Sequence, residues 1–180
     1  LTEINQGELL MDKLHIENRI KNAINRLYYY DHLILSNNSS ERAIVHRLAV
    51  HLGTVFYKWD VDVEYNRNLN DKKQFDEMTT KLIYQLSNNR DFLTGRKSIY
   101  PDIIIHKRQT NNNLLALEIK KMAVSDRLEQ FDLDKITGYI LDASLRYKYA
   151  AFIKLGNGKK YSIIIKSREE VLSEGIFKEQ

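Results

Sequence analysis

The single proline of this 180-residue chain, Pro101, marks the start of the segment that most constrains the fold. Proline cannot donate to a sheet ladder and suits the first residue of a strand, so the apolar run 102–106 is predicted to be a strand. A second apolar run, 114–120, follows closely. Residues 109–113 between them are turn-tolerant, so the two runs are predicted to pair as a hairpin.

Charged residues lie at one end of this predicted hairpin. Side chains alternate between the two faces of a strand, so Glu118 and Lys120 point the same way. Leu114 and Ala116 are expected on that same face, which therefore turns from apolar to charged along its length. Asp102 stands at the beginning of the neighbouring strand. One hairpin can thus bring together two carboxylates and an amine.

Two converging carboxylates suit Mg²⁺, which takes hard oxygen ligands and keeps other positions for water and substrate phosphate. A metal held by Asp102 and Glu118 would lower the pKa of a bound water. Lys120 would orient that water or stabilise negative charge growing on a phosphate. The alternative is that Asp102 is a polar residue at a strand end and that Glu118 and Lys120 form a solvated pair on an edge strand.

The pattern Pro101-Asp102 followed by Glu118-Ile119-Lys120 resembles the signature of the PD-(D/E)xK nuclease superfamily. The resemblance implies a single α/β domain with a mixed central β-sheet flanked by helices, the restriction-endonuclease-like fold. It also implies hydrolysis of phosphodiester bonds with Mg²⁺, for which Mn²⁺ could substitute. Asp102, Glu118 and the backbone carbonyl of Ile119 would be metal ligands, and Lys120 would act in catalysis.

A helix is predicted upstream, where apolar residues are spaced for one buried stripe: Ile44, Val45, Leu48, Leu52 and Val55. Glu41 lies at its beginning and on its inward side, where its carboxylate could reach the metal or its water. The superfamily often places a glutamate on its first core helix, so Glu41 is included among the candidate catalytic residues. The alternative is a capping box, with Asn38 as N-cap and Glu41 at the third helical position.

The chain is predicted to be one nuclease-like domain, 1–180, with a core at 38–165 and a helical insertion near 71–88. An N-terminal helical extension, 1–35, carries a helix over 2–30 with its own apolar stripe. That stripe must be covered, either by the core of this chain or by a second copy in a homodimer.

The region after the hairpin is predicted to complete the sheet. A helix over about 126–141 contains Lys135, which by the same resemblance is a neighbour of the active site; the alternative is a solvated helix lysine. Strands at 147–153 and 161–165 flank a glycine-rich turn.

Composition limits the function classes. The absence of cysteine excludes disulfides, thiol catalysis and cysteine-ligated zinc. A formal charge of +4 permits nucleic-acid binding without demonstrating it. No secretory or membrane-length apolar run occurs, so a cytoplasmic protein without a membrane partner is expected.

These observations predict a Mg²⁺-dependent nuclease that acts on DNA. The composition, rich in asparagine and lysine, suits a bacterial protein of restriction, repair or phage defence. One alternative is a nuclease-like nucleic-acid-binding module that is inactive or needs a partner protein. The other is a regulatory interaction protein that dimerises.

Overall fold

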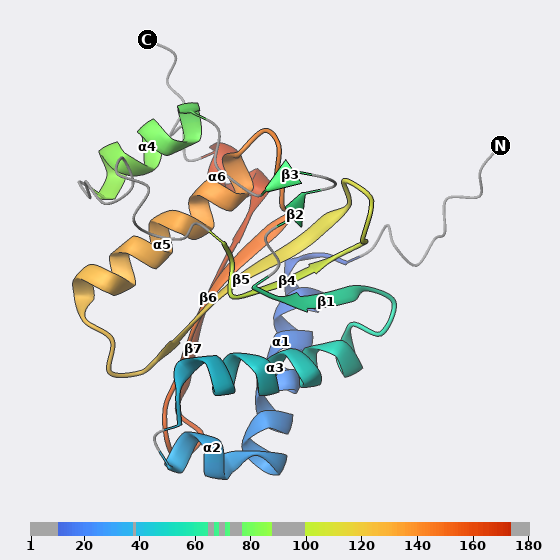
Figure 1. Cartoon of the computed structure of the whole chain (residues 1–180), viewed down its shortest axis with the longest axis vertical. Coiled ribbons are helices and arrows are strands. Elements are labelled where there is room, and N and C mark those ends of the chain that lie inside the picture. The colour runs from blue at the N-terminus through green and yellow to red at the C-terminus, as the bar shows by residue number, and fades with distance from the viewer. Residues whose placement is uncertain are drawn as a thin grey trace, which may run out of the picture.

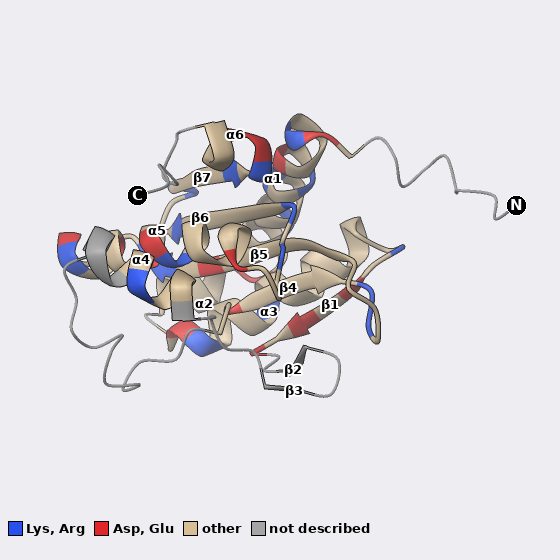
Figure 2. Cartoon of the chain, turned by 90° about the horizontal axis from the view of Figure 1, so that it is seen from above, with Lys and Arg blue, Asp and Glu red and all other residues tan. Residues whose placement is uncertain are grey.

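The computed structural model describes residues 11–37, 39–64, 67–68, 71–72, 77–87 and 100–173, with 67–68, 71–72, 77 and 84–87 described by backbone alone. The described residues form a single α/β domain around a five-stranded sheet (Figure 1). Its strands are β1 (Asp60–Val63), β4 (Ile103–His106), β5 (Asn113–Lys121), β6 (Tyr149–Leu155) and β7 (Tyr161–Ser167). They lie in the order β1-β4-β5-β6-β7, which can be followed from bottom to top in Figure 2.

The sheet is mixed. β4 and β5 pair antiparallel as the predicted hairpin, and β6 and β7 pair antiparallel around the glycine-containing turn. β5 and β6 are parallel, and helix α5 (Asp126–Leu141) connects them. Parallel neighbours need such a long crossover because a tight turn can only reverse the chain. The described residues also include a two-stranded sheet of β2 (Arg67–Asn68) and β3 (Asp71–Lys72).

Helices cover both faces of the sheet (Figure 1). One face carries α1 (Lys13–Tyr30) and α3 (Glu41–Val55), with the short α2 (His32–Ser36) between them in sequence. The other carries α5, with α4 (Glu77–Ser87) and α6 (Arg168–Ser173) packed against it. Within the described ranges, no helix combines the length and apolar character needed to cross a membrane.

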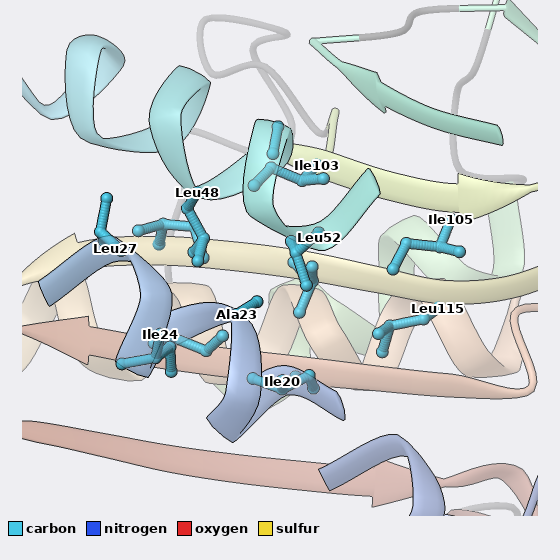
Figure 3. Close-up of a cluster of buried hydrophobic side chains, with 14 of the residues drawn as sticks. Ile20, Ala23, Ile24, Leu27, Leu48, Leu52, Ile103, Ile105 and Leu115 are labelled. Atoms are coloured by element: carbon cyan, nitrogen blue, oxygen red, sulfur yellow. The ribbon is translucent and has the colours of Figure 1, made fainter. Parts of the chain in front are cut away.

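The larger core lies between the sheet and helices α1 and α3 (Figure 3). Ile20, Ile24 and Leu27 of α1 are fully buried there, against residues of α3, β4 and β5. The apolar stripe of α1 is therefore covered by this chain's own core, as one of the two interpretations predicted. The interpretation of that stripe as a dimer interface is wrong, and a homodimer would use another surface.

The second core lies between the sheet and α5, and it corrects one detail of the predicted strand faces. Ala116 packs on the α5 side, whereas Leu114 belongs to the core on the α1 side. The cause is a register shift: Ile105 pairs with Leu115, but His106 pairs with Asn113. The β5 strand thus carries one extra residue, and such a bulge reverses the side-chain alternation on either side of it.

Several elements differ from prediction in their boundaries, among them the last two strands, which were predicted at 147–153 and 161–165. The N-terminal helix is described from Lys13, after Asp12 as N-cap, and residues 1–10 lie outside the described part. The insertion begins with the β3 strand at 71–72, and its helix is described only from Glu77. Helix α6 directly continues β7 and was not predicted.

Tyr28 anchors the end of α1 to the turn between β6 and β7. Its hydroxyl lies 2.7 Å from the carbonyl oxygen of Gly156 and 2.6 Å from that of Lys160, and donates to them. We expect Tyr28→Phe to lower the free energy of unfolding by about 1 kcal/mol, since two carbonyls lose a shared donor. Urea denaturation measures this change. Tyr57→Phe, at an exposed tyrosine, is the control and should leave stability unchanged.

Candidate metal and phosphodiesterase site

The hairpin register places Asp102 beside Glu118. Ile103 pairs with Leu117, so Asp102 lies one residue beyond the last pair, opposite Glu118. Its Oδ2 accepts a hydrogen bond of 2.7 Å from the backbone N–H of Ile119. The proline before it, Pro101, is buried at the beginning of the strand. Sequence spacing and strand pairing thus bring the two predicted carboxylates to one place.

Lys120 lies on the same face of β5 as Glu118. Its side chain contacts α3 and α5, two helices that cover opposite faces of the sheet. Its Nζ donates to Glu41 Oε1 at 2.8 Å and lies 3.8 Å from Asp132 Oδ2. Because β5 is a central strand between β4 and β6, the interpretation of Glu118 and Lys120 as a solvated pair on an edge strand is wrong. Lys120 is held in a partly buried ionic network.

Glu41 reaches this network because it stands at the first position of α3. The N-cap is Ser40, whose Oγ accepts from the N–H of Ala43 at 3.3 Å. The capping-box interpretation, which needed Glu41 at the third helical position, is therefore wrong; Asn38, its proposed N-cap, lies outside the described residues. The Glu41 side chain binds Lys120 instead of the helix end.

Glu118 is fully buried and is held by two side chains of α5. Tyr139 donates its hydroxyl to Oε1 at 2.6 Å, and Nζ of Lys135 lies 2.7 Å from Oε2. Lys135 also donates to Asp132 Oδ1 at 3.2 Å. The interpretation of Lys135 as a solvated helix lysine is wrong, because this residue is buried in the cluster.

Asp132 and Tyr139 are cluster members that sequence reasoning missed. Together with Lys135 they stand at positions i, i+3 and i+7 of α5, which places all three on one helical face. Acidic and basic residues follow one another closely along this helix (Figure 2). The spacing predicts that these residues share a face, but it does not predict their burial, because a solvated helix face shows the same pattern.

The cluster borders a pocket of about 380 Å³. Asp102, Glu118, Lys120 and Lys135 line it together with residues from the other side, namely Arg42, Glu64, Tyr100 and Pro101. Arg42 and Glu64 form an ion pair of 3.0 Å at this border. The opening is large enough for a phosphate group and several waters, given a share of about 30 Å³ per water in the liquid.

The cluster carries more negative than positive groups. Among the described residues it contains four carboxylates, those of Glu41, Asp102, Glu118 and Asp132, and the ammonium groups of Lys120 and Lys135. Four negative against two positive charges leave an excess of two negative charges when all six groups are ionised. A divalent cation would balance this excess.

Burial and the neighbouring charges change the pKa of two of these carboxyl groups. Burial raises the pKa of Glu118 from 4.5 to about 8; Lys135 opposes the rise, and the charges of Asp102 and Asp132 add to it. Burial likewise raises the pKa of Asp102, against the hydrogen bond from Ile119 and the charges of Lys120 and Lys135. Both carboxyl groups therefore bind a proton, or another cation, more readily than a carboxyl group in water does.

The pKa values of the two lysines are also raised, although burial acts on them in the opposite direction. Burial alone would lower the pKa of Lys120, but the hydrogen bond to Glu41 and the charges of Asp132 and Asp102 outweigh it and raise this pKa. The pKa of Lys135 is raised in the same way, with burial opposed by Glu118 and Asp132. Both amines stay protonated at neutral pH.

The residues present fit a Mg²⁺ ion. Within the described part of the chain, no three His, Cys, Asp or Glu side chains are grouped as a complete metal cage. Mg²⁺ does not require one, since it is usually bound by one or two carboxylates together with water and substrate phosphate. Oε2 of Glu118 is buried and lies 2.7 Å from Nζ of Lys135, and because a carboxylate oxygen has a second lone pair, Glu118 is still a candidate ligand.

A backbone carbonyl also points toward this end of the hairpin. The N–H and C=O of one residue point to the same edge of a strand. Since the N–H of Ile119 points to Asp102, its carbonyl oxygen points to the same side, beyond the last pair between β4 and β5. Asp102, Glu118 and the Ile119 carbonyl thus offer oxygen atoms at one end of the hairpin.

The predicted site residues Asp102, Glu118, Ile119 and Lys120 are therefore close together, and Glu41 is bonded to Lys120. Their roles in metal binding and catalysis stay predictions. Comparisons of the chain with family models, curated proteins and solved structures found no match.

Proposed function

We propose that this protein is a Mg²⁺-dependent nuclease that hydrolyses phosphodiester bonds in DNA. The observation that supports this most is the hydrogen bond from the Ile119 N–H to Asp102, which holds Asp102 beside Glu118 in a cluster of four carboxyl groups and two ammonium groups. The mixed sheet, with its acidic hairpin end, supports a restriction-endonuclease-like fold as part of the same proposal.

Asp102, Glu118 and the carbonyl of Ile119 would hold the metal. When bound, Mg²⁺ would supply Lewis-acid stabilisation of the phosphate and a water of lowered pKa. Tyr139 and Lys135 position Glu118 by contacts to its two oxygens. A ligand fixed by such neighbours keeps its geometry, and the loss of an outer contact of this kind typically costs about 10- to 100-fold in metal affinity or activity.

Lys120 would act as a fixed positive charge. Its raised pKa keeps it protonated, so it donates hydrogen bonds and does not accept a proton from water. Glu41 holds the amine within the pocket. From there Lys120 would orient the attacking water or stabilise charge developing on the phosphate, and such donors contribute about 10²- to 10³-fold in rate.

A cleavage assay tests the proposal. The protein is incubated with supercoiled plasmid, linear duplex, single-stranded DNA and RNA, in Mg²⁺, Mn²⁺ or EDTA. We expect DNA to be cut with either metal and spared in EDTA, and Lys120→Gln to cut about 10²-fold more slowly because the positive charge is lost. Lys121→Gln, at the next residue of β5, is the matched control. Equal cutting by wild type and Lys120→Gln would contradict the role given to this lysine.

A wild type that cuts no substrate but binds Mg²⁺ in a titration would instead indicate a nuclease-like module that needs a partner. A wild type that neither cuts nor binds metal would overturn the proposal.

A further inference from the structure

A second pocket, of about 430 Å³, lies between the end of α1 and the turn that joins β6 to β7. It is lined by Asn25, Arg26, Tyr29, Tyr30 and Lys159. Two of these side chains are cationic and none is acidic. The lining is therefore suited to an anion.

Arg26 brings a cation without an acidic partner among the described residues to this pocket. Its Nε is buried and has no hydrogen-bond partner among the described residues, while its guanidinium lies 5.5 Å from the centre of the Tyr30 ring. Within the described ranges, no carboxylate lies within ion-pair distance of Arg26 or Lys159. The nearby Asp31 is already bound by Arg47 and by His51, at 2.9 and 2.6 Å. A guanidinium without an acidic partner favours a phosphate, whose oxygens accept charge-assisted hydrogen bonds from it.

An exposed aromatic ring stands beside these cations. Tyr29 is 74% exposed and meets Tyr30 edge to face, with ring centroids 4.7 Å apart. Tyr30 is already in contact with Arg26 and stacks on His51, so Tyr29 is the ring that offers a free face. Exposed rings next to basic groups are the combination on which proteins stack the bases of single strands.

The turn holds the backbone of Lys159 in a left-handed conformation that residues with a side chain rarely adopt. Lys159 has φ +61° and follows Gly158 at φ +67°. The left-handed region costs a residue with a side chain about 1 to 2 kcal/mol, and glycine is the residue that avoids this cost. Lys159→Gly therefore removes the side chain without straining the backbone of the turn. A loss of binding in this variant would report on the side chain alone.

This pocket is at the same end of the sheet as the charged cluster. β5 and β6 are parallel, and Lys121 pairs with Leu155 at their ends. The turn begins at Gly156, directly after β6, and Tyr28 of α1 donates a hydrogen bond to the Gly156 carbonyl. A polynucleotide strand that leaves the Lys120 region along this end of the sheet would meet Lys159 and Arg26.

We propose that this pocket binds a single strand of nucleic acid, with a phosphate on Arg26 and Lys159 and a base stacked on Tyr29. The inference rests on the proposed nuclease function and names the form of its substrate. Single strands are favoured over duplex because the face of a base is free to stack on Tyr29 only where the base is unpaired.

Binding without cleavage tests the inference. Fluorescence anisotropy is measured in EDTA with a labelled single-stranded DNA 20-mer and with the matching duplex. We expect the wild type to bind the single strand more tightly. Tyr29→Ala should weaken this binding about 5- to 100-fold, because base stacking on an aromatic ring is lost, and Tyr29→Phe should restore it. Tyr57→Ala, at an equally exposed tyrosine after α3, should bind like the wild type.

The role of the positive charge of Lys159 is tested by the dependence of binding affinity on salt concentration. Lys159→Gly should reduce the slope of log affinity against log salt by about 0.7, the value for one phosphate contact in a single strand. Its thermal midpoint should be unchanged or higher, because glycine relieves the positive φ. Lys13→Gln, at the opposite end of α1, is the matched control and should keep the slope.

The outcomes separate this inference from the nuclease proposal. Wild-type affinity in Tyr29→Ala and Lys159→Gly, or tighter binding of duplex, would overturn the inference and leave the nuclease proposal standing. The same holds if neither oligonucleotide binds while the wild type still cuts DNA in Mg²⁺. Absence of both binding and cutting would overturn the two together. Retention of free inorganic phosphate without any oligonucleotide would mark a small-anion site and contradict the strand assignment.

Discussion

Asp102→Asn is expected to lose Mg²⁺-dependent cleavage down to the background rate while the protein stays folded. The amide oxygen of asparagine can still accept the hydrogen bond from Ile119, which is 2.7 Å long in the wild type, so the hairpin end keeps its shape. What is lost is one of the two carboxylate charges nearest the proposed metal. The loss should exceed the roughly 10- to 100-fold effect of removing an outer-shell partner.

Two measurements check this result. Cleavage is followed on the substrate that the wild type prefers, and Mg²⁺ affinity is measured by calorimetric titration. Asp126→Asn removes an exposed carboxylate from the first turn of α5 and should behave like the wild type. An Asp102→Asn protein that cuts at the wild-type rate would show that this carboxylate does not hold the metal.

Glu118 is expected to make the metal-free protein less stable as pH rises from about 5 to about 8. Its pKa is raised, mainly by burial, from 4.5 to about 8 in the folded protein. Between these values the folded state holds a proton that the unfolded state has released, so unfolding becomes easier with rising pH. The contribution is fully present below pH 4.5 and is lost above pH 8. Its size should be on the order of a few kcal/mol.

Urea denaturation in EDTA at pH 5.5 and pH 8.0 measures this loss. Glu118→Gln should flatten the pH dependence, because the amide keeps an acceptor for Tyr139 and has no charge to desolvate. Glu129→Gln is the control, since Glu129 is a glutamate of α5 that likewise pairs with a lysine, Lys154, at 2.7 Å. Mg²⁺ should restore stability at pH 8.0 more than at pH 5.5. A wild type and a Glu118→Gln variant with the same slope would contradict the assignment.

The hairpin could be predicted because its signals are local. Strand alternation fixes the relation between Glu118 and Lys120, and a proline before Asp102 marks where the strand begins. The bulge that moves Leu114 to the other face has no such local signal. It depends on how β4 and β5 pair near His106, and turn-rich segments such as 109–113 are compatible with more than one register.

The polar face of α5 could not be predicted with the same rules. Asp132, Lys135 and Tyr139 look like solvated helix residues because charged side chains usually are. Their burial is decided by Glu118 on a strand that is distant in the sequence. Rules based on local sequence pattern cannot identify a partner that is distant in the sequence. The capping box, the alternative interpretation of Glu41, is wrong for a related reason, since Lys120 offers this glutamate a charged partner that the helix end does not.

The ionic network around Lys120 also has a consequence for the order of folding. It joins Glu41 to a lysine 79 residues further along the chain, and it includes Asp132 of the crossover helix. Contacts of such sequence separation form late, because loop closure must precede them. We therefore expect the pocket to be completed after the sheet and to be absent from partly folded chains. A bound cation should accordingly slow unfolding while leaving the refolding rate almost unchanged.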